Sequence, residues 1–204
     1  MFGIPEKAMI RQPLSKKRFY SKFRLRADDK NCFEDDVSRV TIVGYISPRT
    51  VPAFHEGEKV KGYYVLLLYL KNRNYRDRNI QMLFRCIHQN MVFVLEYGGE
   101  AQMIMNCNGL QKSGWMPIDE LHIKLEGLDM DAAWTNLIAY IGGYNVHSEQ
   151  TIEEQIIDKN EIDKINKEIK ALLTKRNKTK QTQEKFALHK QIVALQAKLK
   201  EYEQ

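Results

Sequence analysis

The segment from Lys71 to Arg78 has the residue types that bind phosphate. It reads Lys-Asn-Arg-Asn-Tyr-Arg-Asp-Arg, between an apolar run and a helical pattern. Arginine can bind phosphate oxygens through two parallel hydrogen bonds, a tyrosine ring can stack on a base, and a helix N-terminus weakly attracts anions. An ordinary solvated loop has the same composition, so both interpretations stay open. The nucleic-acid contacts that we predict here are Lys71, Arg73, Tyr75, Arg76 and Arg78.

A second basic segment, residues 7–26, mixes aromatic side chains with its cations. Such a mixture suits a nucleic acid, because the cations meet phosphates while the rings stack on bases. We predict contacts by Lys16, Lys17 and Arg18. The rings have an alternative role in the hydrophobic core, because Phe19 and Phe23 are four residues apart on one helix face.

The sharpest enzymatic hypothesis is a metal-dependent nuclease of the restriction-endonuclease type. Such a site needs an acidic residue followed by an (Asp/Glu)-x-Lys triplet on a central strand, where the carboxylates hold Mg²⁺. Lys71 ends the predicted central strand, but Tyr69 stands where the carboxylate is needed. As an active nuclease of this type, the chain would therefore lack a main metal ligand. A nuclease-like enzyme with a degenerate or displaced site is the alternative.

Other chemistry has little support in the sequence. The acidic residues at 28–29 and 34–36 are expected to cap helices or to be solvated. Cys86 and His88 are two apart on a predicted helix and do not face each other. Nucleotide-binding glycine loops and serine-hydrolase motifs are absent from the sequence. We therefore expect no metal site and no cofactor.

The elements that must position these residues indicate one α/β domain over residues 1–143. Its pattern is α-α-β-β-α-β-β-β-α, which predicts an α/β sandwich with a mixed or mostly antiparallel sheet of about five strands. Asp28 or Asp29, Asp77 and Asp129 are candidate helix caps. The predicted strands cover residues 39–46, 60–71, 91–97, 101–106 and 121–125, with 60–71 central and with Gly98-Gly99 turning a hairpin.

After a linker at 144–150, residues 151–204 predict a helical hairpin or short coiled coil. Thr151-Ile-Glu-Glu154 matches a capping box. Two apolar seams with heptad spacing are separated by the polar residues 176–185. They can pack on each other, on the body or in an oligomer. The predicted partner-binding residues are Ile162, Ile165, Ile169, Leu172, Leu188, Ile192, Leu195 and Leu199.

Charge is segregated along the chain. The net charge is +7 over residues 1–26, −7 over 27–169 and +6 over 170–204. Basic ends can bind phosphate or an acidic protein, although solvated helix faces are equally lysine-rich. The three scattered cysteines, the absence of a signal-like N-terminus and the lack of a long apolar run favour a cytoplasmic protein without membrane contact.

A series of residues in fixed order along nearly the whole chain carries a resemblance to a known family. These residues are Lys17, Phe19-Tyr20, Phe33, Asp36, Ser47-Pro48, Thr50, Leu70-Lys71, Phe93–Tyr97, Trp115, Leu125–Asp129, Trp134 and Lys185–Ile192. In them the chain resembles a bacterial domain-of-unknown-function family, numbered forty-three ninety-one. That resemblance implies an intracellular prokaryotic protein whose relatives tend to neighbour helicases and DNA methyltransferases in phage-defence loci, and it implies no catalytic residues.

Two functions follow as hypotheses. The first is a non-catalytic accessory subunit of an antiviral defence or restriction-type assembly, which binds a helicase or methyltransferase of the same locus and nucleic acid. The second is the nuclease-like enzyme with a degenerate or displaced site. A homo-oligomer formed through the C-terminal helices is compatible with either.

Overall fold

The computed structural model describes residues 1–202, which form two compact units. The first unit is residues 1–147 and the second begins at Ser148. Among the helices that the structure describes, none combines the length and the apolar character that a membrane span requires. The elements of the first unit are η1 Glu6–Ala8, β1 Met9–Pro13, α1 Lys16–Phe23, α2 Ala27–Asp36, β2 Val37–Ile46, β3 Tyr63–Leu70, α3 Asp77–Cys86, β4 Met91–Tyr97, β5 Glu100–Asn106, β6 Leu110–Lys112, β7 Met116–Pro117 and α4 Met130–Gly142.

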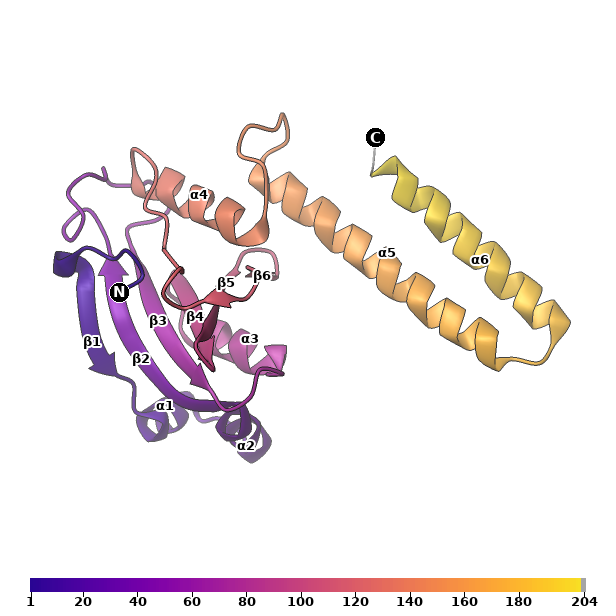
Figure 1. Cartoon of the computed structure of the whole chain (residues 1–204), viewed down its shortest axis with the longest axis horizontal. Coiled ribbons are helices and arrows are strands. Elements are labelled where there is room, and N and C mark those ends of the chain that lie inside the picture. The colour runs from indigo at the N-terminus through magenta and orange to yellow at the C-terminus, as the bar shows by residue number, and fades with distance from the viewer. Residues whose placement is uncertain (203–204) are drawn as a thin grey trace. The chain divides into compact units, whose positions relative to one another are not determined.

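The sheet of the first unit has seven strands in the order β1-β2-β3-β4-β5-β6, with β7 paired to β5 (Figure 1). Among the described strands of the sheet, only β3 and β4 pair in parallel, because α3 connects them as a crossover, whereas the other pairs are antiparallel. This confirms the predicted α/β class with a mostly antiparallel sheet. Strand β3 lies inside the sheet between β2 and β4, as its continuous apolar run predicted.

Helices cover both faces of this sheet. The even-numbered side chains of β3, Leu66, Leu68 and Leu70, pack with Phe19 of α1, Phe33 of α2 and Ile80 of α3. Because side chains alternate along a strand, Tyr63 points to the opposite face. There its ring lies 5.2 Å from that of Trp134 on α4. The aromatic residues of α1 thus take the core role that was the alternative to base stacking.

Several boundaries differ from the sequence-based expectation. No strand forms at residues 121–125, where Leu121 and Ile123 are buried but Ile123 makes a single main-chain bond, to Phe2. The alternation of apolar and polar residues in this segment therefore reflects burial of its apolar side chains, without pairing to a neighbouring strand. Strands β1, β6 and β7 were not predicted, because they are short or contain proline.

Helix caps were predicted correctly only in part. Asp129 accepts a hydrogen bond from the Ala132 amide, and Thr151 forms the predicted capping box with Glu154. Helices α2 and α3 start earlier than expected, so that Arg26 and Arg76 occupy their N-cap positions. The aspartates expected as caps lie instead in the first turn, where a negative charge still favours the helix dipole.

The second unit is a hairpin of two helices, α5 Ile152–Lys178 and α6 Thr182–Glu201. Only residues 179–181 connect them, a shorter link than the predicted polar stretch 176–185. The polar residues that flank this link, at 176–178 and 182–185, are compatible with helix, and their side chains need no apolar partner when they face solvent. Each helix therefore extends into the polar stretch.

Candidate nucleic-acid interface

The basic segment 71–78 lies between the end of β3 and the first turn of α3, and most of its charges are paired within the chain. Arg76 donates through Nε and Nη2 to the two carboxylate oxygens of Asp36, at 3.1 and 2.8 Å. It also donates to Asp35 at 3.2 Å. The Arg76 amide donates to Asp36 as well, at 2.8 Å. This arginine therefore joins the start of α3 to the end of α2.

Asp36 is the buried centre of this contact, with 3% of its surface exposed. Its carboxylate accepts a further hydrogen bond, of 2.7 Å, from the side-chain amide of Asn79, which is also buried. Burial alone would raise the pKa of Asp36, but the hydrogen bonds from Arg76 and Asn79 outweigh it and hold the pKa below its usual value. The carboxylate is thus a structural anion rather than a proton carrier.

Three other residues of this segment that were predicted to contact nucleic acid also have partners within the chain. Arg78 pairs with Asp29 at 2.6 Å, and Arg73 pairs with Glu100 at 2.7 Å while its guanidinium lies 5.1 Å from the Trp115 ring centroid. The hydroxyl of Tyr75 donates to Gln102 at 2.6 Å. Among the described residues, the Lys71 ammonium has no hydrogen-bond or ion-pair partner, and its side chain is exposed. The segment therefore offers less free positive charge than its composition indicated.

The second predicted basic segment has one cation that is paired within the chain and two that are exposed. Lys16 forms an ion pair with Glu34, and Tyr20 donates to the same carboxylate at 2.7 Å. Burial would raise the pKa of Glu34, but these two bonds outweigh it and lower the pKa. Lys17 and Arg18 are exposed on α1. The acidic residues at 28–29 and 34–36 thus include the partners of both basic segments, which their separate positions in the sequence did not reveal.

The described residues contain no carboxylate cluster of the kind that the nuclease hypothesis requires for its metal. Within residues 1–202, no group of three or more His, Cys, Asp and Glu side chains has the geometry of a metal site. Tyr69, two residues before Lys71, lies under the guanidinium of Arg39, at 4.0 Å from the ring centroid. Lys71 is joined to Asp36 only through its amide, which donates to the Asp36 carbonyl at 2.8 Å.

The seam residues of the hairpin pack on each other. Ile165 and Ile169 of α5 and Ile192 of α6 form a buried centre, and Leu172, Leu195 and Leu199 pack against it. Leu188 is also buried and Ile162 is half-buried. The structure thus forms the first of the three packings that the sequence left open, in which the helices pair within one chain.

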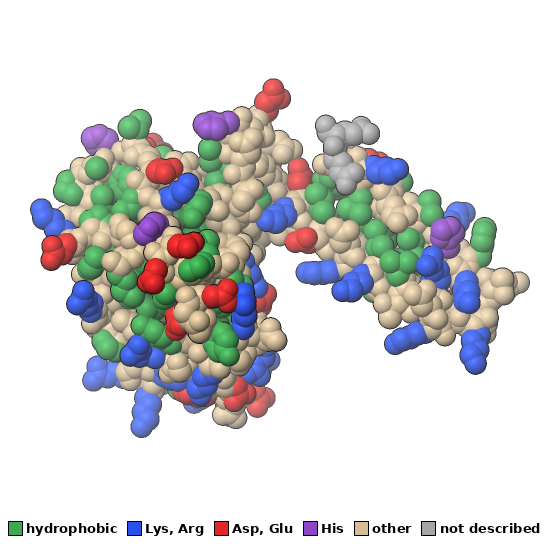
Figure 2. All heavy atoms as spheres, viewed as in Figure 1, with side chains coloured by type: hydrophobic (Ala, Val, Ile, Leu, Met, Phe, Trp, Pro, Cys, Tyr) green, Lys and Arg blue, Asp and Glu red, His purple; other side chains and the backbone are tan. Residues whose placement is uncertain are grey.

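The outer surface of the hairpin is basic near its turn. Residues 170–190 carry one acidic residue, Glu184, which pairs with Lys175 at 3.6 Å. In the part of the chain that the structure describes, the other cations here have no carboxylate within ion-pair distance. On the face drawn in Figure 2, blue side chains surround the turn end of the hairpin. These unpaired cations are Lys170, Arg176, Lys178, Lys180, Lys185 and Lys190.

Two large apolar side chains also stay exposed on α6. Phe186 is 73% and Val193 48% exposed. They are seven residues apart, so they share one face of the helix, outside the seam. The heptad pattern of the seam does not include these two positions, so it gave no indication of this face.

The model of one protein family, described as a domain of unknown function (DUF4391), matches residues 2–199. No curated protein and no solved structure matches the chain.

Proposed function

From the premise that this chain belongs to the DUF4391 family, we propose that it is a non-catalytic accessory subunit of a bacterial antiviral defence or restriction-type assembly. It binds nucleic acid and a partner enzyme, and the basic turn end of the hairpin supplies the main phosphate contacts. The observation that carries this proposal is the contrast in pairing: Arg73, Arg76 and Arg78 have carboxylate partners, whereas six cations around the turn of the hairpin have none among the described residues.

Unpaired cations matter because they can exchange solvent for phosphate without first breaking an ion pair. An arginine such as Arg76 would have to leave a buried carboxylate uncompensated, which is costly. A lysine on an exposed helix surface has no such cost, and its binding to phosphate releases condensed counterions. The hairpin is therefore a better phosphate-binding surface than segment 71–78.

The partner enzyme, a helicase or methyltransferase of the same locus, is proposed from the family resemblance alone. Because the seam of the hairpin is already paired, a partner protein would have to bind its outer surface. Phe186 and Val193 offer an exposed apolar contact there. An apolar contact with a rim of cations suits a partner with an acidic rim.

The test compares two full-length variants with the same charge. The first replaces Lys178, Lys180, Lys185 and Lys190 with Gln, and the control replaces Lys164, Lys167, Lys198 and Lys200 with Gln. Binding to a fluorescein-labelled duplex oligonucleotide is followed by anisotropy across a salt series. Loss of four phosphate contacts should weaken binding and reduce the slope of log K against log salt by roughly 3 to 4.

The control variant should retain most of the slope, because its four lysines lie away from the turn. Equal losses in both variants would show that net charge, rather than the turn end, governs binding. Salt-insensitive binding, or no binding of the unmodified chain to duplex or single strand, would refute the nucleic-acid part of the proposal.

A further inference from the structure

Two cavities adjoin at the end of the sheet where β3 and β4 begin. One has a volume of about 430 Å³ and the other of about 580 Å³, within the ~300–1,000 Å³ typical of ligand pockets. Both are lined by Ile87, Gln89 and Met91. We call the combined hollow the sheet-end groove.

Among the residues that the structure describes, no acidic side chain lines either cavity of this groove. Its charged lining residues are all basic, Arg18, Lys22, Lys59 and Lys61, while residues 27–169 carry a net charge of −7. A third cavity of the same unit, about 650 Å³, includes Glu126 in its wall. The absence of carboxylates is thus a local property of the groove, and it makes the groove attractive to anions.

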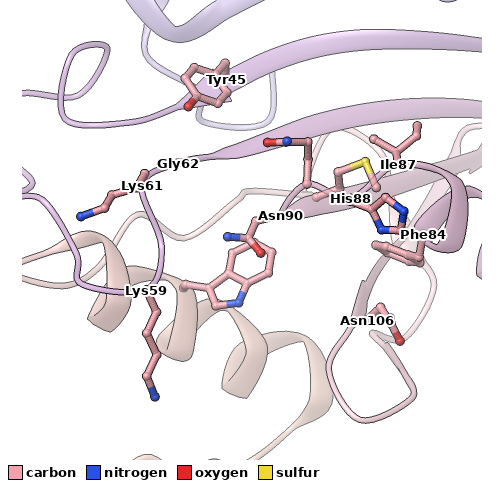
Figure 3. A pocket seen from close by; sticks show the side chains of 12 residues that line it. Tyr45, Lys59, Lys61, Gly62, Phe84, Ile87, His88, Asn90 and Asn106 are labelled. Carbon is pink, nitrogen blue, oxygen red and sulfur yellow. The ribbon is translucent and has the colours of Figure 1, made fainter.

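One end of the groove carries the loop with Lys59 and Lys61, which Asp131 holds in place. The Asp131 carboxylate, in the first turn of α4, accepts bonds from the amides of Val60 at 2.7 Å, of Glu58 at 2.6 Å and of Lys59 at 3.2 Å. These bonds lower the pKa of Asp131, with that from Val60 contributing most. In Figure 3 this loop lies to one side of Asn90, and His88 lies to the other.

The opposite end of the groove carries Arg18 and Lys22, four residues apart on α1 and therefore on one helix face. Both are exposed, and among the described residues neither has a carboxylate partner. Lys22 lies 5.4 Å from the ring centroid of Phe23. Positive charge thus stands at both ends of one groove.

Aromatic and amide side chains lie between these ends. Tyr45 lines one cavity and Tyr64 the other, and their ring centroids are 4.6 Å apart. Trp134 lines the first cavity and is fixed by its contact with Tyr63. Asn90 and Gln89 add amide groups that can donate and accept hydrogen bonds.

We propose that the sheet-end groove binds single-stranded nucleic acid. The phosphates contact Lys59 and Lys61 at one end and Arg18 and Lys22 at the other, and bases stack on the rings between them. This assignment fits a single strand because a duplex keeps its base faces within its own stack, whereas every unpaired base has a face that an aromatic side chain can cover. It rests on the proposed function for the expectation that the protein binds nucleic acid.

The first test uses Trp134 as a local reporter. In the full-length Trp115→Phe variant it is the only tryptophan, because the chain contains two. Addition of oligo(dT) should quench its fluorescence through stacking, and the duplex of the same strand should not. Unchanged Trp134 fluorescence while anisotropy reports saturation of the labelled oligo(dT) would overturn the proposal.

The second test compares matched charge variants in the full chain. Replacing Arg18, Lys22, Lys59 and Lys61 with Gln should weaken oligo(dT) binding at least tenfold. Replacing the exposed cations Lys7, Arg26, Arg49 and Arg85 with Gln, outside the groove, should change it less than threefold. Circular dichroism checks that both variants are folded, and equal effects would overturn the assignment.

The outcomes separate this proposal from the proposed function. Both variants are therefore measured with both the duplex and oligo(dT). If only the variant of the hairpin turn loses binding to either ligand, the hairpin binds nucleic acid and the groove does not. If only the groove variant loses binding and the hairpin variant binds the duplex unchanged, the groove binds and the hairpin proposal fails. Binding of thymidine monophosphate with the affinity of oligo(dT) would show a mononucleotide pocket and would also overturn the single-strand assignment.

Discussion

At the residue scale, Asp36 is the group on which the packing of α2 against α3 most depends. Its carboxylate accepts hydrogen bonds from the backbone amide and the guanidinium of Arg76 and from the side chain of buried Asn79. Only 3% of the surface of Asp36 is exposed. Removing a buried acceptor leaves its donors unsatisfied, which costs more than the bond contributed. The arginine that looked like a phosphate ligand is therefore a structural partner.

We expect Asp36→Asn to lower the free energy of unfolding by about 2–3 kcal/mol, because the new amide presents a donor to Arg76 and Asn79. The neighbouring Asp35→Asn is the control. Asp35 is 68% exposed, so its pair with Arg76 should contribute less than about 1 kcal/mol. Urea unfolding of the two variants measures the difference, and equal losses would argue against a buried role for Asp36.

The lowered pKa values of Asp36 and Glu34 predict a pH dependence of stability. Each carboxyl titrates lower in the folded chain than in the unfolded chain, where about 3.9 and 4.3 are ordinary values. Above these unfolded-state values each carboxylate makes its full contribution to the free energy of unfolding, and this contribution is lost as the pH falls through the folded-state pKa. The free energy of unfolding should therefore decline below about pH 4, and less steeply in a variant with Asp36→Asn and Glu34→Gln.

At the element scale, the hairpin depends on a seam only a few residues long. Most of the stability of a helix in a protein comes from the packing of its apolar face, so the contact of α5 with α6 must stabilise both helices. The sequence predicted the two seams and the capping box at Thr151, because periodicity and capping are local properties. It did not decide what the seams would pack against.

Neighbouring positions on α6 separate the seam from the outer face. Ile192→Ala should destabilise the hairpin by about 2–3 kcal/mol, because Ile192 is 3% exposed and truncation leaves a cavity. Val193→Ala, at a position 48% exposed, should change the stability of the hairpin by less than about 0.5 kcal/mol. Amide hydrogen exchange across residues 152–201 measures this locally, since two units need not unfold together. Similar exchange in both variants would contradict the packing.

At the scale of the whole molecule, charge is organised by pairing as well as by sequence position. The three net charges along the chain suggested basic ends on an acidic body. In the fold, acids of α2 pair with Lys16 of the N-terminal segment and with Arg76 and Arg78 of segment 71–78. Among the described residues, cations without a carboxylate partner collect at the hairpin turn and in the sheet-end groove. The two proposed contacts are therefore not those that composition alone indicates.

The amino-acid sequence by itself determined the α/β class, the central β3, the Gly98-Gly99 turn, the α4 cap at Asp129 and the helical hairpin. These depend on side-chain periodicity, capping and glycine backbone freedom, which act over a few residues. Only the tertiary structure decided which cations are free. Asp36 and Arg76 are forty residues apart, so no local pattern records that they pair. Tyr45 and Trp134 come from different elements, so no local pattern records that they line one cavity. An ion pair or a cavity wall exists only once the chain has folded.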